Sequence, residues 1–317
     1  MRRIIGVVAL CALLTGVSNV AAAYPEKPIR LVVSYPPGGA SDVLARLVGQ
    51  HLSSKWNVPV VVENRPGGNT QIGTQMIARA PADGYTFGLV NQALTLNHSL
   101  YGTLPYDSRQ DFTPISLIAS SPLVLFVNDE MEARTLGDLV DYSKRNPGKL
   151  NYSSAGSAML AIGEMFRNAS GVDAAPVSYK GSGPAVMAVA SGEVSYTIET
   201  LLTARPLLEA KKLRALAAAS TERLNVLPEV PTFTEAGLKG YTSFLWFGIV
   251  GPAGIPGDIV QKANQAINEI LKLPEVEAQL SSLASSALHS SPEEFRKFLD
   301  AEFERYADVV KKNGLKP

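Results

Sequence analysis

Short apolar runs alternate with amphipathic segments along the chain, and polar turns separate them. Residues 29–33 form an apolar run that ends in the turn Pro36-Pro37-Gly38-Gly39. From Asp42 onward, apolar side chains recur at helical spacing. The repeated order of strand, turn and helix predicts a doubly wound parallel sheet. Further strands are expected at 58–62, 86–90, 123–127, 150–153, 176–178, 194–199, 213–218 and 242–250, and helices at 72–80, 135–145, 157–168 and 183–190, followed by three helices to the end.

Both halves of the chain follow this α/β order, which indicates two similar lobes. The length of 317 residues, with 46% hydrophobic and 18% charged residues, is sufficient for two domains with sizeable cores. We expect a first lobe at 24–122 plus 240–317 and a second lobe at 123–239. Capping motifs that begin at Thr135 and Ser291 predict the starts of two helices.

The first 23 residues have the layout of a secretory signal peptide. Arg2 and Arg3 precede an apolar run of about a dozen residues, and small residues lead up to a cleavage site near Ala23. An uncleaved anchor is the alternative interpretation. The only cysteine, Cys11, lies inside the apolar run, so the exported chain would contain no disulfide. No later apolar run reaches the length of about 18 residues that a membrane-spanning helix needs.

Charge and motif content exclude several classes of function. Lys and Arg total 29, as do Asp and Glu, and this balance argues against a nucleic-acid-binding protein, which needs excess cations. The chain has no zinc-protease, Cys-x-x-Cys, Walker, dinucleotide-binding or Gly-x-Ser-x-Gly motif. Its three histidines, His51, His98 and His289, lack metal-ligand spacing. We therefore predict no catalytic residue, no metal and no cofactor, with a Ser-His-Asp hydrolase that uses His98 as the alternative.

Three polar, glycine-rich turns stand between predicted strands and helices. They cover residues 35–42, 65–70 and 153–157. Glycine allows a ligand to approach the backbone closely, and the free N–H groups of a helix start suit an anion. Asp42 could instead act as a helix N-cap. Ligands of open α/β sheets bind at the carboxyl ends of the strands, so two facing lobes would form a cleft that binds a carboxylate without a buried arginine.

A series of short motifs also occurs in a specific order along nearly the whole mature chain. The motifs are Tyr24-Pro25-Glu26-Lys27-Pro28-Ile29, Pro37-Gly38-Gly39, Glu63-Asn64-Arg65-Pro66-Gly67, Asp83-Gly84-Tyr85-Thr86, Leu104-Pro105-Tyr106-Asp107, Tyr179-Lys180-Gly181, Leu213-Arg214-Ala215-Leu216-Ala217, Pro228-Glu229-Val230-Pro231-Thr232, Gly251-Pro252-Ala253-Gly254 and Pro292-Glu293-Glu294-Phe295. In this series the chain resembles the substrate-binding proteins of tripartite tricarboxylate transporters, the Bug family.

The resemblance implies a type II periplasmic binding protein of the Venus-flytrap kind, with two doubly wound α/β lobes and a central cleft. Such a protein captures a small organic carboxylate (a dicarboxylate, an aromatic acid or an amino acid) and delivers it to membrane permease subunits, as a monomer and without performing chemistry. Two alternatives stay open: a periplasmic hydrolase on a bilobal scaffold, and a sensor subunit that presents its ligand to a membrane kinase.

The resemblance also points to ligand-binding residues in both lobes. Arg205 could reach a second carboxylate of the ligand, or it could be a solvated helix residue. The family's usual His in the stretch that follows Ser153-Ser154 is absent, which leaves the ligand's identity open. The remaining candidates are Tyr35, Gly38, Gly39, Ala40, Ser41, Asp42, Asn69, Thr70, Asn91 and Gln92 in the first lobe, and Ser153, Ser154, Gly156, Ser157 and Glu199 in the second.

Overall fold

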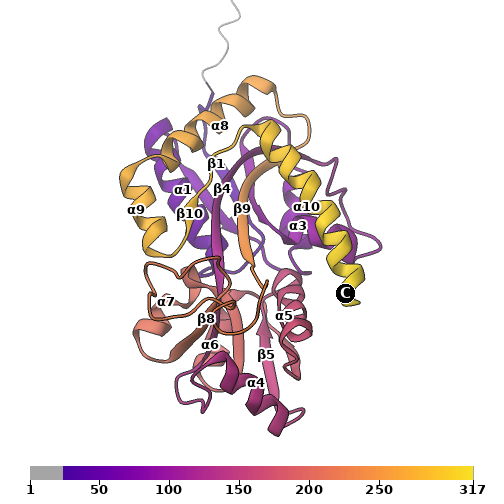
Figure 1. Cartoon of the computed structure of the whole chain (residues 1–317). Helices are drawn as coiled ribbons and strands as arrows, with labels where there is room; N and C mark the ends of the chain where they lie inside the picture. The colour runs from indigo at the N-terminus through magenta and orange to yellow at the C-terminus, as the bar shows by residue number, and fades with distance from the viewer. Residues whose placement is uncertain (1–23, 317) are drawn as a thin grey trace, which may run out of the picture.

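Two α/β lobes lie one above the other in the computed structural model, which describes residues 24–316 (Figure 1). The predicted signal peptide lies outside these residues. In the described part of the chain, no helix combines the length and the apolar character needed to cross a membrane. The prediction of two α/β lobes is confirmed.

The first lobe is built on a mixed sheet in the order β2-β1-β3-β9-β4. β1 pairs in parallel with both β2 and β3, whereas β9 lies antiparallel between β3 and β4. The strands are β1 (Ile29–Val33), β2 (Val60–Asn64), β3 (Thr86–Asn91), β4 (Phe112–Asn128), β9 (Phe244–Pro252) and β10 (Ser286–Ala287), and the helices are α1 (Ala40–Trp56), α2 (Gln71–Ala78), α3 (Ala93–Leu100), α8 (Gly257–Leu271), α9 (Pro274–Ser282) and α10 (Pro292–Asn313).

The second lobe continues the sheet from the far half of β4. There β4 pairs antiparallel with β7 and β8, and β5 pairs in parallel with β6 and β7. The elements are β5 (Leu150–Ser154), β6 (Ala174–Ser178), β7 (Tyr196–Thr200), β8 (Leu213–Ala218), α4 (Leu136–Arg145), α5 (Ser157–Ser170), α6 (Ser182–Ala190) and α7 (Leu201–Glu209).

Strand β4 runs through both lobes, as Figure 1 shows. Its first half pairs with β9 and its second half with β7, with register shifts between Pro114 and Ser116 and between Leu117 and Ala119. The sequence predicted only residues 123–127 of this 17-residue strand, because Pro114 and Pro122 interrupt the strand pattern. Since the lobes share a strand, the proposed boundaries at 122/123 and 239/240 stay a prediction.

Three further expectations differ from the structure. The sheet is mixed and not purely parallel, because β4 and β9 run antiparallel to their neighbours. α3 was not predicted, since its six buried residues mix polar and apolar side chains and so give no amphipathic pattern. α7 was not predicted either, because Pro206 inside it argues against a helix.

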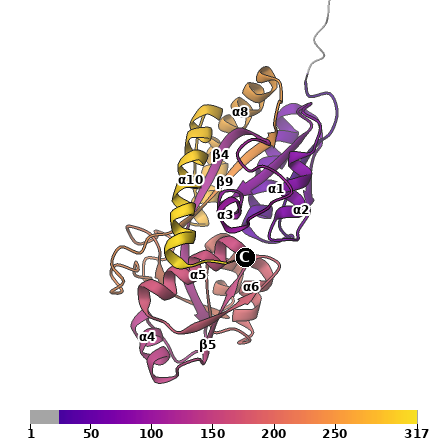
Figure 2. The same ribbon diagram turned by 90° about the vertical axis from the view of Figure 1, so that its right-hand side faces the viewer.

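Helix α10 joins the two lobes. It begins with the predicted capping box, in which the Ser291 hydroxyl accepts from Glu294 N–H and the Glu294 carboxylate accepts from Ser291 N–H. Near the helix end Asn313 accepts a hydrogen bond of 2.9 Å from Asn168 of α5. Figure 2 shows this end of α10 beside α5, so the last helix of the first lobe also contacts the second.

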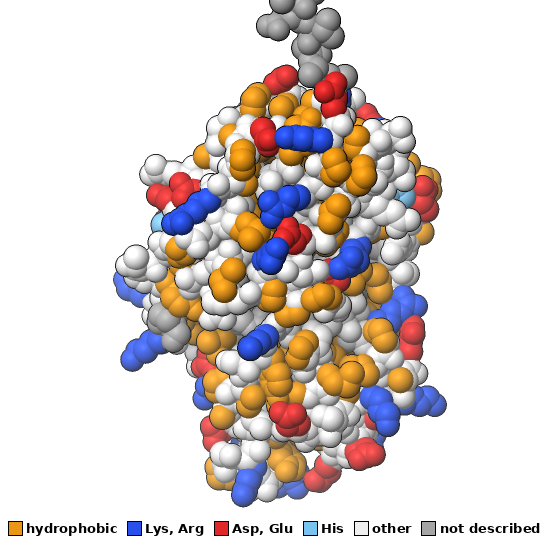
Figure 3. All heavy atoms as spheres, turned by 180° about the vertical axis from the view of Figure 1, so that it is seen from behind, with side chains coloured by type: hydrophobic (Ala, Val, Ile, Leu, Met, Phe, Trp, Pro, Cys, Tyr) orange, Lys and Arg blue, Asp and Glu red, His pale blue; other side chains and the backbone are white. Residues whose placement is uncertain are grey.

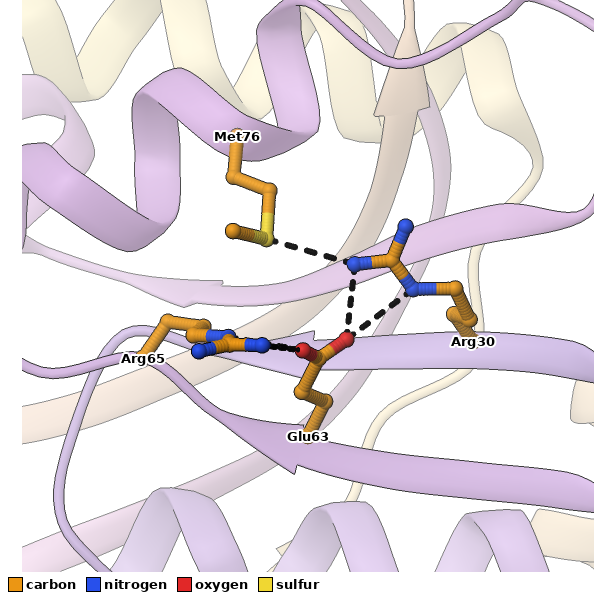
Figure 4. A network of polar contacts seen from close by, with 4 residues as sticks. All are labelled: Arg30, Glu63, Arg65 and Met76. Atoms are coloured by element: carbon orange, nitrogen blue, oxygen red, sulfur yellow. Dashed lines mark hydrogen bonds and ion pairs between the residues drawn. The ribbon is translucent and has the colours of Figure 1, made fainter.

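A polar network fixes the edge strand β2 of the first lobe to its neighbour β1 (Figure 4). Arg30 of β1 donates to Oε2 of Glu63 in β2 from Nε at 2.9 Å and from an Nη at 2.7 Å, and it also contacts the sulfur of Met76. Arg65 pairs with the other oxygen of Glu63. These guanidinium groups, Arg30 first, lower the pKa of Glu63. The network holds the end of β2, from which the second glycine-rich turn departs.

Candidate ligand-binding site

Glycine-rich turns from the two lobes face each other at short distance. A Cβ atom at Gly181 would lie 2.8 Å from Cδ of Pro36, and one at Gly39 would lie 3.7 Å from Cβ of Ser182. A Cβ atom at Gly156 would lie 3.7 Å from Oδ1 of Asn69. The first turn therefore opposes the turn before α6, and the second opposes the turn before α5.

Two adjoining cavities lie between these turns. The inner chamber has a volume of about 20 Å³ and the outer chamber one of about 410 Å³. Both are lined by Tyr35, Ala155 and Gly181, so they adjoin. No charged side chain lines the inner chamber, and only Lys180 does so in the outer one. The cleft is therefore nearly uncharged.

The helices that start at the cleft leave their first N–H groups without side-chain caps. α1, α5 and α6 have the N-cap residues Gly39, Gly156 and Gly181, none of which can provide a side-chain acceptor. Among the helices that begin away from the chambers, α4 and α10 carry complete capping boxes, whereas α8 and α9 have no side-chain cap. Uncapped N–H groups and the helix dipole both favour an anion. Three such ends from two lobes meet at the same chambers.

The first turn is held in shape by Asp42, which is 4% exposed. Its carboxylate accepts hydrogen bonds from the N–H of Gly38 at 3.0 Å and from Nδ2 of Asn64 at 2.9 Å, and it pairs with Arg46. The N-cap of α1 is Gly39, so the interpretation of Asp42 as N-cap is wrong. Burial raises the pKa of Asp42, but the hydrogen bonds from Arg46, Gly38 and Asn64 outweigh it and hold the pKa below its ordinary value.

We expect Asp42→Asn to destabilise the protein by roughly 1–3 kcal/mol at neutral pH, because the turn loses its charged acceptor. The pKa of Asp42 is lower in the folded than in the unfolded state, so its contribution is present above the ordinary Asp value of 3.8 and is lost as the pH falls through the folded-state value. Urea unfolding at several pH values measures this, with the exposed Asp300→Asn as control. A difference from wild type that persists unchanged in acid would contradict the assignment.

A buried hydrogen bond connects the lobes beside the second turn. The Ser157 hydroxyl donates to Oδ1 of Asn97 at 2.6 Å, and Nδ2 of Asn97 donates to the carbonyl of Asn69 at 2.8 Å and to Oγ1 of Thr70 at 3.3 Å. Asn69 in turn donates to the Tyr101 hydroxyl. Ser157 of α5 is thus bonded to the first lobe across the cleft.

Tyr35 and Asn91 line the inner chamber on the side of the first lobe, and Gln92 is buried behind them. The Tyr35 hydroxyl donates to Oδ1 of Asn91 at 3.1 Å, and the same oxygen accepts from the N–H of Ala93. Burial raises the pKa of Tyr35, so its hydroxyl keeps its proton. Gln92 donates from Nε2 to the carbonyl of Phe244 at 2.7 Å, which connects α3 to the start of β9.

The second lobe places buried polar groups at the carboxyl ends of its strands. Ser153 and Ser154 end β5, and their hydroxyls have no hydrogen-bond partner among the described residues. Glu199, 1% exposed, is the penultimate residue of β7. Burial raises the pKa of Glu199, and the nearby Ser182 hydroxyl and the N–H of Thr200 offset only part of this effect.

Arg205 lies apart from the other candidates. Its Nε donates to Oε1 of Glu209 at 2.7 Å, and its Nη1 donates to the carbonyl of Ser282 at 2.5 Å. It lines neither chamber, so the structure does not bring it to the cleft.

Half of the predicted residues line the chambers directly. Gly38 and Asp42 shape the first turn, whereas Gln92, Ser153, Ser154, Ser157 and Glu199 are buried behind the lining. Those in the lining are Tyr35, Gly39, Ala40, Ser41 and Asn91 of the inner chamber, with Asn69, Thr70 and Gly156 of the outer chamber.

Part of the lining was not predicted from the sequence. The turn 179–183 lines both chambers from the second lobe, and its Lys-Gly-Ser-Gly sequence between a strand and a helix is the signal that could have found it. Met159 and Phe247 supply apolar contacts, and Asn97 the connecting hydrogen bond. Within residues 24–316, no three His, Cys, Asp or Glu side chains are grouped to hold a metal ion.

Known proteins share this architecture. A family model described as "Tripartite tricarboxylate transporter family receptor" matches residues 44–315. Protein BugT of Bordetella pertussis is 33% identical over 322 aligned positions, which cover 100% of this chain and 99% of BugT. Rpa4515 of Rhodopseudomonas palustris, solved with adipate, is 34% identical with a TM-score of 0.90, covering 93% of this chain and 99% of its own. MatC from the same organism, solved with bound malate, is 29% identical with a TM-score of 0.85. The match covers 90% of this chain and 100% of MatC.

The family model and the full-length match to BugT agree with the order of motifs in the sequence and with the two-lobed architecture. This chain therefore belongs to the tripartite tricarboxylate transporter receptor family, as a substrate-binding protein of the Bug family.

Proposed function

We propose that this protein captures a small organic acid in the periplasm and delivers it, as a monomer, to the membrane permease subunits of a tripartite transporter. The observation that carries the proposal is the nearly uncharged pair of chambers between the lobes, on which three uncapped helix starts converge. The signal-peptide pattern of the first 23 residues supports export. The face seen in Figure 3 carries interspersed basic and acidic side chains, and the net charge of zero does not favour the binding of nucleic acid.

The sizes of the chambers favour a ligand with a carboxylate head and a longer body. A volume of about 20 Å³ admits one or two water-sized groups, which is the scale of a single carboxylate. The outer chamber of about 410 Å³ falls within the usual range for small-molecule sites. Asn69, Thr70 and Lys180 there would meet the far end of the ligand. The adipate of Rpa4515 and the malate of MatC support a dicarboxylate.

Capture would proceed by closure of the lobes. The open protein would bind the acid on the first lobe, at the N–H groups of Gly39, Ala40 and Ser41, and closure would bring the turn around Ser182 onto it. The hydrogen bond between Ser157 and Asn97 joins the lobes in the closed arrangement. Exclusion of water then strengthens the remaining polar contacts.

Thermal-shift measurements with adipate, malate, aspartate and benzoate test the proposal. A ligand at a concentration of about 100 Kd is expected to stabilise the protein by about 2.7 kcal/mol, and calorimetry should give one site per chain. Dimethyl adipate is the matched neutral control, which should neither bind nor be consumed. A flat response to all four acids would refute an organic-acid receptor, and hydrolysis of the ester would favour the enzyme.

A further inference from the structure

A buried carboxyl group lies directly behind the inner chamber. Oε1 of Glu199 accepts the N–H of Thr200 at 2.8 Å, whereas Oε2 has no hydrogen-bond partner among the described residues. Its neighbours Ser182 and Tyr35 both line the chamber. Glu199 thus has one buried oxygen without a partner among the described residues, behind residues that line the inner chamber.

The elements packed against β7 bring no unpaired cation to Glu199, since Arg167 of α5 pairs with Glu164 of the same helix. β4 and α6 contain no acidic or basic residue, and β5 contributes only Tyr152, which donates to Glu164 on the opposite face of the sheet. The charged residues of α7, Arg205 and Glu209, pair with each other. Two titratable groups remain on the cleft side. Tyr35 keeps its proton, and Lys180 lines the outer chamber but not the inner one.

An ionised Glu199 would oppose the binding of an anion in the inner chamber. Two like charges a few ångströms apart in a site of low dielectric repel by several kcal/mol, whereas a protonated carboxyl group donates a short O–H···O⁻ hydrogen bond. Burial raises the pKa of Glu199, which favours the protonated form.

We propose that Glu199 is a neutral carboxylic acid in the ligand-bound protein and donates its hydrogen to an oxygen of the bound acid, so that each ligand is captured together with one proton from solvent. This inference rests on the proposed function and adds a residue that determines which charge state the site accepts. The proton moves onto Glu199 when the lobes close, and it returns to solvent when the ligand leaves.

The sign of the pH dependence follows from this linkage. The pKa of Glu199 is higher in the closed, ligand-bound state than in the open one, so the affinity is greatest at low pH. It falls by up to about tenfold per pH unit as the pH rises through the range between the two pKa values.

Calorimetry with adipate between about pH 6.5 and 9, where both of its carboxyl groups are ionised, tests the inference. For the wild type we expect the affinity to fall with pH and the apparent enthalpy to vary with the ionisation enthalpy of the buffer, which counts the protons taken up. Glu199→Gln keeps a neutral donor and should bind with little dependence on pH and no proton uptake. Glu222→Gln, at an exposed position of the same lobe, should behave as the wild type.

Each other result overturns the inference. Proton uptake of zero in the wild type would refute the capture of a proton together with the ligand, without requiring any variant. Loss of adipate binding at every pH in a folded Glu199→Gln protein would mean that the site needs the carboxylate as an acceptor. Failure of the proposed function is distinct: neither adipate nor malate would then bind the wild type at any pH, and the inference would fall with it.

Discussion

Gly39→Trp is expected to weaken the binding of organic acids by at least about a hundredfold, or roughly 3 kcal/mol. Gly39 is the N-cap of α1 and lines the inner chamber, and a Cβ atom there already lies 3.7 Å from Cβ of Ser182. An indole at this position would fill the chamber and keep the lobes apart. Calorimetry with the acid that gives the largest thermal shift measures the effect.

The matched control is Gly257→Trp. Gly257 is the first residue of α8, is exposed, and has open space around the position of a Cβ atom. This variant should keep the wild-type affinity. Should Gly39→Trp bind as tightly as Gly257→Trp, the first turn would lie outside the binding site.

Trp246→Ala is expected to lower the free energy of unfolding by about 3–5 kcal/mol. Trp246 is fully buried in β9, its ring meets Phe295 and Phe298 edge-on, and its Nε1 donates to Oε2 of Glu302 at 2.7 Å. Truncation leaves a cavity and removes a partner from the buried carboxylate of Glu302. The melting temperature should fall by roughly 10 °C, as measured by circular dichroism.

The second tryptophan of the chain provides the control for this variant. Trp56 ends α1, is only half-buried, and has an edge contact with Tyr24. Trp56→Ala should therefore cost much less than Trp246→Ala. Equal losses in the two variants would contradict the central role of the Trp246 contacts.

The first lobe's site was the part most visible in the sequence. The Pro-Pro-Gly-Gly turn before α1 can be predicted from the local sequence, because these residues favour both the turn and the start of the helix. The equivalent turn before α6 carries the same signal in Lys180-Gly181-Ser182, yet its position opposite Pro36 depends on how the lobes pack. Sequence reasoning finds such turns one at a time, and only the fold shows which of them meet.

Other features depend on tertiary structure and left no local pattern. Asn97 lies inside a helix that is buried on nearly all sides, so nothing in its neighbourhood indicates that it bonds to Ser157 across the cleft. Likewise, the sequence around Asp42 is compatible with a helix N-cap and with a ligand-binding residue. The hydrogen bonds that Gly38 and Asn64 donate to its carboxylate show that it stabilises the turn. Long-range partners decide these roles.

The place of β9 in the sheet has a consequence for the order in which the molecule assembles. β9 is the last long strand in the chain, yet it fills the gap between β3 and β4. Until residues 244–252 arrive, β3 and the first half of β4 have open edges, which are prone to pairing with other chains. The segment from the second half of β4 to β8, by contrast, contains all the strands of the second lobe. The second lobe can therefore complete its sheet before the first lobe does, although part of the first lobe precedes it in the chain.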